Sequence, residues 1–293
     1  MTTSGLNATR LVNWAALKET CSGSGCHIRN FSRSLLARKY GVRIGESWFC
    51  GPDCFLEGVE IRVRELRRLG EFRAVPRSLR LPLGLLLVSR GCITKDQLRV
   101  AVEQQHSEGR ALGEILCELR FATERQVAEA TATQWGCPFY SAKVNSGEIQ
   151  ARIPSTVLRL AAMAPVYHAA ATNRLLIGFV KGIDHTALRT IEEMTGCLTE
   201  PCFITASECQ ENIRSLTGRS IEVNFDRVSS VVEMANIVQS YAFQIGADEA
   251  RFAICCGLLW VRLNRDCQPT DLLFSLAGAM VGDLEVDHDG TQS

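Results

Sequence analysis

Several hallmarks of catalysis are missing from this 293-residue sequence. No Gly-rich segment ends in Gly-Lys-Ser or Gly-Lys-Thr, the motif whose backbone holds nucleotide phosphates, and this excludes ATP hydrolysis of that type. The five histidines form neither a metal-binding pattern nor the surroundings of a catalytic nucleophile. Since no nucleophile, base or catalytic metal pattern is found, we predict that the chain is not an enzyme.

Signals for export and membrane insertion are missing as well. Residues 1–16 show no basic region followed by an apolar stretch and a small-residue cleavage site, so we predict no signal peptide. The longest apolar runs, such as Leu81–Val88 with Pro82 inside it, are too short to span a membrane. The 13 cysteines are odd in number and scattered through apolar segments, which is atypical of a secreted disulfide framework. We therefore expect a soluble cytoplasmic protein without membrane insertion.

Charge is unevenly distributed although it sums to zero. Residues 1–77 hold 13 Lys/Arg against 7 Asp/Glu, whereas the rest of the chain holds 19 against 25. The excess of positive charge in the first quarter could form a surface for nucleic acid or an acidic partner. It could equally be the solvated face of an arginine-rich helix.

Four cysteines near the N-terminus occur in two short-spaced pairs, Cys21 with Cys26 and Cys50 with Cys54. Two such pairs suit one tetrahedral zinc ion, and four cysteine ligands indicate a structural rather than a catalytic metal. His27, next to Cys26, could replace Cys21 as the fourth ligand. The sequence leaves this choice open.

The second cysteine pair lies at the start of a predicted helix. From Phe55 to Leu69 apolar residues recur at helical spacing, and most of the arginines lie away from that stripe. A cysteine pair in a loop, followed by a second pair at a helix start, resembles a treble-clef zinc finger. We expect residues 1–77 to form this zinc module.

An internal repeat is the most specific signal in the chain. Residues 83–105 and 112–134 align with an offset of 29. Each unit begins with Leu-Gly, has a Thr before a helix and ends in Gln. Thr94 and Thr123 are natural N-caps, and a Gln three residues after each completes a capping box. Each unit predicts a short helix, a turn and a second helix, and the two hairpins are expected to form one small bundle.

With these residues the sequence resembles the MshEN family, the N-terminal domain of type II secretion and type IV pilus assembly ATPases. The first copy matches the family motif at Leu83, Gly84, Leu87, Val88, Gly91, Ile93, Leu98, Val102 and Gln105, and the second at Leu112, Gly113, Leu116, Cys117, Val127 and Gln134. The resemblance continues to about residue 218. It implies a small α/β unit with strands near 162–168, 174–180 and 202–204 and helices near 185–195 and 206–216.

The resemblance also implies binding of cyclic-di-GMP by backbone and apolar contacts, with leading arginines engaging guanine and phosphate. The candidate positions are Arg80, Leu83, Gly84, Leu87, Gly91, Leu98, Gln105, Arg110, Leu112, Gly113, Leu116 and Gln134. The sequence departs from the family where Pro82 and Ala111 replace the arginines, and where Arg120 replaces the second internal glycine. Lost charge-assisted contacts weaken binding, so both a ligand-binding domain and a retained scaffold remain open.

Residues 219–280 predict a further small α/β domain. A helical pattern over 228–245 ends at Gly246, and strand-like runs follow at Ala250–Cys255, Leu258–Leu263 and Thr270–Leu276. The adjacent Cys255 and Cys256 are expected to point to opposite faces of a strand and to serve packing. Residues 281–293 are expected to be an acidic tail.

The expected fold class is thus α+β in several domains. These are the zinc module at 1–77, an MshEN-like domain at 78–218 (repeat 78–138, α/β unit 139–218), the domain at 219–280 and the tail. We expect a non-catalytic regulatory or adaptor protein that docks on a protein partner, by family analogy a secretion or pilus assembly component. The alternative is a nucleic-acid-binding regulator whose basic zinc module contacts phosphate.

Overall fold

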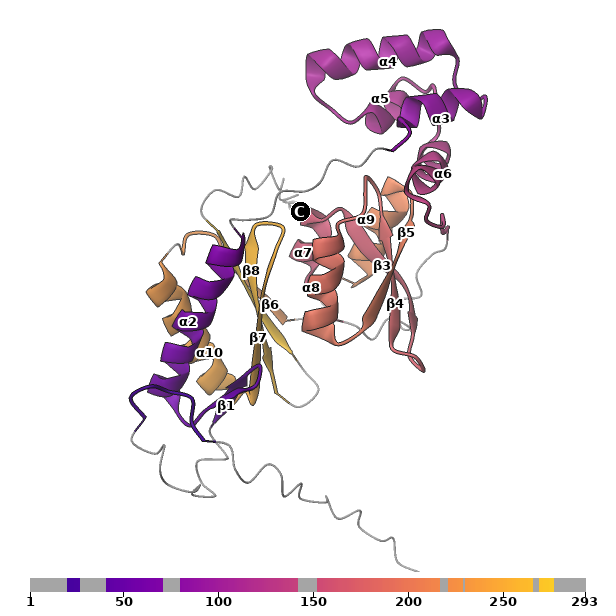
Figure 1. Ribbon diagram of the computed structural model, residues 1–293. Coiled ribbons are helices and arrows are strands. Elements are labelled where there is room, and N and C mark those ends of the chain that lie inside the picture. The colour runs from indigo at the N-terminus through magenta and orange to yellow at the C-terminus, as the bar shows by residue number, and fades with distance from the viewer. Residues whose placement is uncertain are drawn as a thin grey trace, which may run out of the picture.

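The computed structural model describes residues 20–26, 41–70, 80–141, 152–216, 221–228, 230–265 and 269–276. The predictions about residues 1–16, His27 and the tail at 281–293 fall outside these ranges. The described residues form a helical bundle, a three-stranded α/β unit and a larger six-stranded sheet (Figure 1). The α+β class is confirmed. Within these ranges, no helix combines the length and apolar character needed to cross a membrane.

The bundle consists of α3 (Leu83–Ser89), α4 (Lys95–Glu108), α5 (Leu112–Glu118) and α6 (Glu124–Trp135). Both predicted capping boxes are present, since the Thr94 and Thr123 hydroxyls accept from the backbone N–H three residues on and each Gln side chain bonds back. Gly109 and Gly136 end the long helices in the left-handed conformation, as C-terminal glycines commonly do. The two predicted hairpins are therefore confirmed.

The α/β unit begins with α7 (Ser155–Leu160). It continues through β3 (Met163–Ala169), β4 (Arg174–Phe179), α8 (His185–Thr195), β5 (Leu198–Phe203) and α9 (Ala206–Leu216). β4 pairs antiparallel with β3 and parallel with β5, with α8 as the crossover. The predicted strands and helices are confirmed, except that β5 starts at Leu198 rather than near residue 202. The Asp184 carboxylate caps α8 by accepting two backbone N–H bonds.

The large sheet has the strand order β2-β1-β7-β8-β9-β6. Its C-terminal strands are β6 (Ile221–Phe225), β7 (Glu249–Cys255), β8 (Leu258–Asn264) and β9 (Thr270–Ser275), with α10 (Val231–Ile245) between the first two. The predicted helix and three-strand meander are confirmed. The two remaining strands come from the N-terminal region, β1 (Val42–Ile44) and β2 (Ser47–Phe49), and are followed by α2 (Pro52–Gly70).

The two ends of the chain therefore share one sheet, which the sequence did not predict. β1 pairs parallel with β7, so that Arg43 lies beside Glu249 and Ile44 beside Ala250. α2 and α10 lie side by side on one face, where Phe55, Val59 and Val63 of α2 are wholly buried (Figure 1). A hairpin and one helix have too little apolar surface for a core of their own, so burial on the C-terminal sheet stabilises them. The domain limits at 77 and 219 stay predictions.

The opposite face of the large sheet packs against the α/β unit. Trp260 and Leu273 of the sheet belong to the same buried cluster as the core of that unit. One prediction in this sheet is wrong, because Cys255 and Cys256 do not point to opposite faces. β7 ends at Cys255, and Cys256 has a φ of 51°, so the alternation of a strand no longer applies and the two sulfur atoms lie 3.5 Å apart.

Candidate functional site

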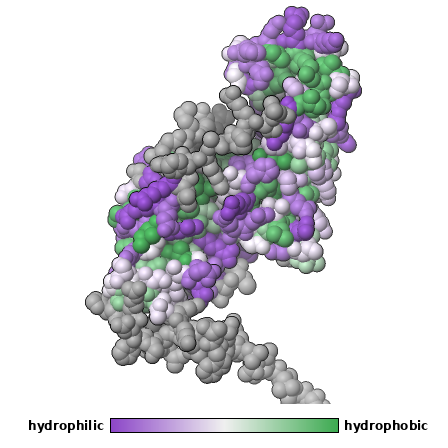
Figure 2. Space-filling view, viewed as in Figure 1, coloured by the Kyte–Doolittle hydropathy of each residue, from purple (hydrophilic) through white to green (hydrophobic). Residues whose placement is uncertain are grey.

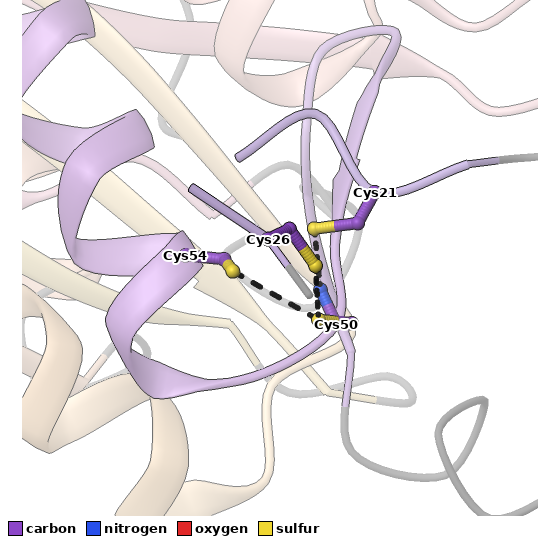
Figure 3. Close-up of side chains that lie close together, drawn as sticks. All are labelled: Cys21, Cys26, Cys50 and Cys54. Carbon is purple, nitrogen blue, oxygen red and sulfur yellow. Dashed lines mark hydrogen bonds between the residues drawn. The ribbon is translucent and has the colours of Figure 1, made fainter. Parts of the chain in front are cut away.

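The four paired cysteines converge on one point between the loop at 21–26 and the start of α2 (Figure 3). Their sulfur atoms all lie within 4.8 Å of one another. The Cys50 sulfur is 3.5 Å from that of Cys26 and 3.9 Å from that of Cys54. A tetrahedral zinc ion with Zn–S bonds of about 2.3 Å places its sulfurs about 3.8 Å apart. The cluster therefore has the size of a zinc site.

Backbone contacts position the loop that carries the first pair. The Ser22 N–H donates to the Trp48 carbonyl of β2, and the Cys50 N–H donates to the Cys21 sulfur at 3.4 Å. Gly23 lies so close to Cys54 that a Cβ there would be 2.9 Å from the Cys54 sulfur. The β1–β2 hairpin thus lies between the two cysteine pairs in the chain and directly precedes Cys50.

Electrostatics in the cluster disfavours thiolates unless a cation is present. Burial and hydrogen bonds from the neighbouring cysteines raise the pKa of Cys54 to about 12. The same causes, burial first, raise the pKa of Cys50 further. A divalent cation reverses this effect because it stabilises the deprotonated form of each ligand. Among the described His, Cys, Asp and Glu residues, only these four gather closely enough to share a metal ion.

The positive charge predicted for the N-terminal module does not lie on the described part of it. Residues 41–70 carry five arginines and five acidic residues, so the excess falls in stretches outside the described ranges. On α2, Arg62 pairs with Glu65 and Arg64 with Glu60. This helix presents a mixed rather than a basic surface, and it gives no support for nucleic-acid binding.

The repeat forms a second candidate site, in which each hairpin packs against the other. α3 contacts α6, and α4 contacts α5. The side-chain amide of Gln105 donates to the Arg110 carbonyl at 3.1 Å, and that of Gln134 donates to the Leu81 carbonyl. The two donor glutamines are 29 positions apart, and so are the two acceptor carbonyls. The bonds therefore join equivalent positions of the repeat. The terminal glutamines of the repeat therefore fix the segments that lead into α5 and α3.

Several predicted ligand positions instead pack inside the bundle. Leu87 and Leu116 are completely buried. A Cβ on Gly84 would overlap the Leu98 side chain, and one on Gly113 would lie 2.7 Å from Val127. These glycines let the short helix of each hairpin approach the long one closely. Half-buried Leu83, Leu98 and Leu112 lie around the same core.

The two predicted anchor arginines lie on the surface, and both contact protein groups. The Arg80 guanidinium stacks 3.1 Å from the centroid of the Trp135 ring. Arg110 pairs with Glu118 at 2.6 Å and with Glu108 at 3.2 Å, and the bond to Glu118 raises its pKa. The repeat offset relates Arg110 to Leu81, not to Arg80, so the two arginines approach the bundle from unequal positions.

The internal turn of each hairpin has the same backbone conformation in both copies. Gly91 has a φ of 69°, and the equivalent Arg120 has a φ of 57°. The arginine therefore adopts a left-handed conformation that favours glycine. Replacement of the glycine has kept the turn at the cost of backbone strain.

Hydrophobic side chains are exposed at the start of the bundle. Leu81, just before α3, is 65% exposed, and Leu85, within α3, is 57% exposed. Figure 2 shows hydrophobic surface gathered on the helical bundle at the top of the view. Such a patch is typical of an interaction surface when it lies on a small domain.

Comparisons with known proteins match about half of the chain or less. No protein-family model matches. The chain is 24% identical over 127 residues to the type IV pilus assembly ATPase PilB of Thermus thermophilus, which is 43% of this chain and 14% of that protein. A solved structure of MshE with cdg covers 46% of this chain and 98% of its own length, at 23% identity and a TM-score of 0.38. The N-terminal domain of XpsE covers 50% of this chain and 100% of its own length, at 21% identity and a TM-score of 0.39.

Proposed function

We propose that the chain is a non-catalytic, cytoplasmic regulatory or adaptor protein whose residues 78–218 are related to the N-terminal domains of type II secretion and type IV pilus ATPases. The observation that carries the proposal is the tandem repeat, whose two hairpins are built alike down to the capping boxes and the Gln105 and Gln134 bonds. The similarity to the pilus ATPase supports it. Because only 14% of that ATPase is spanned, its catalytic activity is not carried over.

The protein acts by docking on a partner, which we propose is a secretion or pilus assembly component. The exposed Leu81 and Leu85 support a docking role for the bundle, since apolar side chains on a small domain are buried most readily by another protein. The zinc module and the large sheet act as a platform, because their helices and strands share one core.

The bundle binds cyclic-di-GMP through groups that remain accessible. Of the twelve candidate positions, Leu87 and Leu116 act only as core, and Gly84 and Gly113 as points of close packing. The arginines are free to leave their present partners because Arg80 and Arg110 are both solvent-exposed. The exposed Gly91 turn, Gln105, Gln134 and the edges of Leu83, Leu98 and Leu112 complete the ligand surface.

Cys21, Cys26, Cys50 and Cys54 hold one structural zinc ion. Their sulfur spacing and position between a hairpin and a helix support this assignment. The metal fixes the loop at 21–26 to the start of α2. It takes no part in ligand binding, because four cysteines leave no open coordination position.

Calorimetric titration with cyclic-di-GMP, with GTP and cyclic-di-AMP as controls, tests the ligand proposal on the full chain. We expect selective binding that Arg80→Ala and Arg110→Ala each weaken about tenfold or more, the loss expected for one charge-assisted contact. Arg99→Ala is the matched control, since Arg99 is an exposed arginine paired with Glu103 on α4. If the native chain shows no binding at millimolar ligand, the repeat is a scaffold and the ligand proposal is wrong.

Gly84 is unsuitable as a test position, because a side chain there would overlap Leu98 and disturb the bundle itself. A loss of binding in such a variant would not separate ligand contact from unfolding. Unfolding midpoints of the arginine variants, measured alongside the titrations, supply this separation. We expect these midpoints to stay close to that of the native chain, as is usual for substitutions at exposed positions.

A further inference from the structure

The tip of the β7–β8 hairpin contains two adjacent cysteines in an unusual turn. Cys255 and Leu258 are directly paired, so Cys256 and Gly257 form a two-residue loop. Their φ angles are 51° and 75°. This is the pattern of a type I′ turn, whose first position favours Asn, Asp or Gly. A cysteine at that position is strained, and strain of this kind points to a function for the side chain.

The turn brings the two sulfur atoms to 3.5 Å from each other. A disulfide has an S–S distance of about 2.0 Å, so the two sulfur atoms lie close enough for a local adjustment of the turn to join them. Cys255 is buried and Cys256 is half-buried at the tip, which leaves Cys256 as the sulfur that a small molecule reaches first.

Electrostatics at the tip separates the roles of the two thiols. The hydrogen bond from Cys255 lowers the pKa of Cys256, and this outweighs burial and the nearby Asp184 carboxylate, which both raise it. The same bond raises the pKa of Cys255, together with burial. Since the thiolate is the nucleophile in disulfide exchange, Cys256 reacts first and Cys255 second.

We propose that Cys255 and Cys256 are a redox modification site that small disulfides, such as glutathione disulfide, convert to a vicinal disulfide. The Cys256 thiolate attacks one sulfur of the small disulfide and expels one small thiolate, which takes up a proton. Cys255 then loses its proton and attacks the Cys256 sulfur, expelling the second small thiol. Two protein thiols and one small disulfide thus yield one protein disulfide and two small thiols. The proposal is independent of cyclic-di-GMP binding.

Formation of the vicinal disulfide is expected to be reversible. The Cα atoms of adjacent residues are about 3.8 Å apart, below the separation usual for disulfides. The ring that a disulfide between adjacent cysteines closes is therefore strained. Strained disulfides are more easily reduced than structural ones and are typical of regulatory sites. Dithiothreitol at low concentration should therefore restore both thiols.

Peptide mass spectrometry tests the proposal, because trypsin releases the two cysteines together. Cleavage after Arg251 and after Arg262 gives the peptide 252–262, whose only cysteines are Cys255 and Cys256. We expect the native full chain, incubated with glutathione disulfide and quenched with acid, to give this peptide lighter by two hydrogen atoms. It should resist alkylation before reduction and take two alkyl groups after reduction.

Single thiols of similar exposure provide the internal control. Cys92 and Cys117 lie alone in their tryptic peptides and are half-buried, so they should give at most mixed disulfides with glutathione. Cys255→Ser should accumulate a stable mixed disulfide on Cys256. Cys256→Asn, which suits the turn and preserves folding, should leave Cys255 unmodified. Two free thiols in the native peptide, or a mixed disulfide that never closes, would overturn the proposal.

Discussion

Arg262 and Asp271 form a buried ion pair between neighbouring strands at the junction of the two sheets. They are direct partners in the β8–β9 register, and the guanidinium contacts both carboxylate oxygens at 2.8 Å. Their side chains are 5% and 0% exposed. Arg262 also donates to the Met194 carbonyl at the end of α8, and Trp260 donates to Asp271. The pair therefore fixes the large sheet against the α/β unit.

Removal of both partners should cost less than the two single removals added together. Asp271→Asn leaves a buried cation without its counter-charge, which costs about 3–5 kcal/mol of unfolding free energy. The double variant Arg262→Met with Asp271→Asn keeps an acceptor for Trp260, so we expect it to cost less than the sum of the single changes. Urea denaturation of the four proteins measures this coupling. If the free-energy losses of the two single variants simply add up to that of the double variant, the predicted coupling is absent. Glu103→Gln, in the exposed pair with Arg99, should cost under about 0.5 kcal/mol.

Restoring the second internal glycine should stabilise the bundle. Arg120 has a φ of 57° without the conformational freedom of glycine, so Arg120→Gly relieves about 1 kcal/mol of backbone strain. The control is Arg99→Gly, an exposed arginine within α4, which should lose about 1 kcal/mol because glycine is a poor helix former. The two denaturation midpoints should therefore move in opposite directions. A lower midpoint for Arg120→Gly would show that the turn is not strained.

Local features of the fold could be predicted from the sequence, whereas long-range pairings could not. Thr94 forms its capping box with Gln97, three positions along the chain, so the local pattern alone predicts it. The pairing of β1 with β7 joins residues some two hundred positions apart, and a three-residue strand carries no signal of its partner. Cys256 was misjudged because strand alternation was applied to a residue that belongs to a turn.

In the candidate sites, too, local features could be predicted from the sequence and long-range contacts could not. The grouping of Cys21, Cys26, Cys50 and Cys54 could be predicted because short spacing within each pair restricts their distances. The equivalent bonds from Gln105 and Gln134 could not be predicted. A glutamine repeated in the sequence looks the same whether its side chain binds a ligand or a backbone carbonyl. Arg262 and Asp271 look like surface residues in the sequence, and only the packing of two sheets buries them.

A carboxylate in the cap of α9 should make stability depend on pH. Burial would raise the pKa of Glu208, but hydrogen bonds from Ser141 and Thr205 to the carboxylate outweigh it, and the pKa is lowered. A lowered pKa in the folded state stabilises the protein above the unfolded value of about 4.3, and this stabilisation is lost as the pH falls through the folded pKa. Glu208→Gln should therefore cost about 1 kcal/mol at pH 7, the value of one charge-assisted hydrogen bond at a partly exposed site.

The measurement is the difference in unfolding free energy between native and Glu208→Gln proteins as the pH is lowered. We expect this difference to shrink below about pH 4, where the native carboxylate becomes protonated. Glu103→Gln, whose carboxylate accepts one exposed contact from Arg99, should show a much smaller difference at pH 7. A Glu208 difference that stays constant across the range would mean that its charge does not contribute to the cap.

Loss of the metal should unfold the N-terminal module while the repeat stays folded. Zinc binding contributes directly to folding in small modules, and the four cysteines proposed to bind it connect the loop at 21–26 to the start of α2. We expect one zinc ion per chain by mass spectrometry of the native protein, and none for Cys54→Ser. Cys92→Ser, outside the cluster, should keep the ion. Because α2 packs on α10, loss of zinc should also weaken hydrogen-exchange protection of α10, with the capped helices α4 and α6 unaffected. A chain without zinc whose α2 and α10 remain fully protected would show that the sheet alone holds the module.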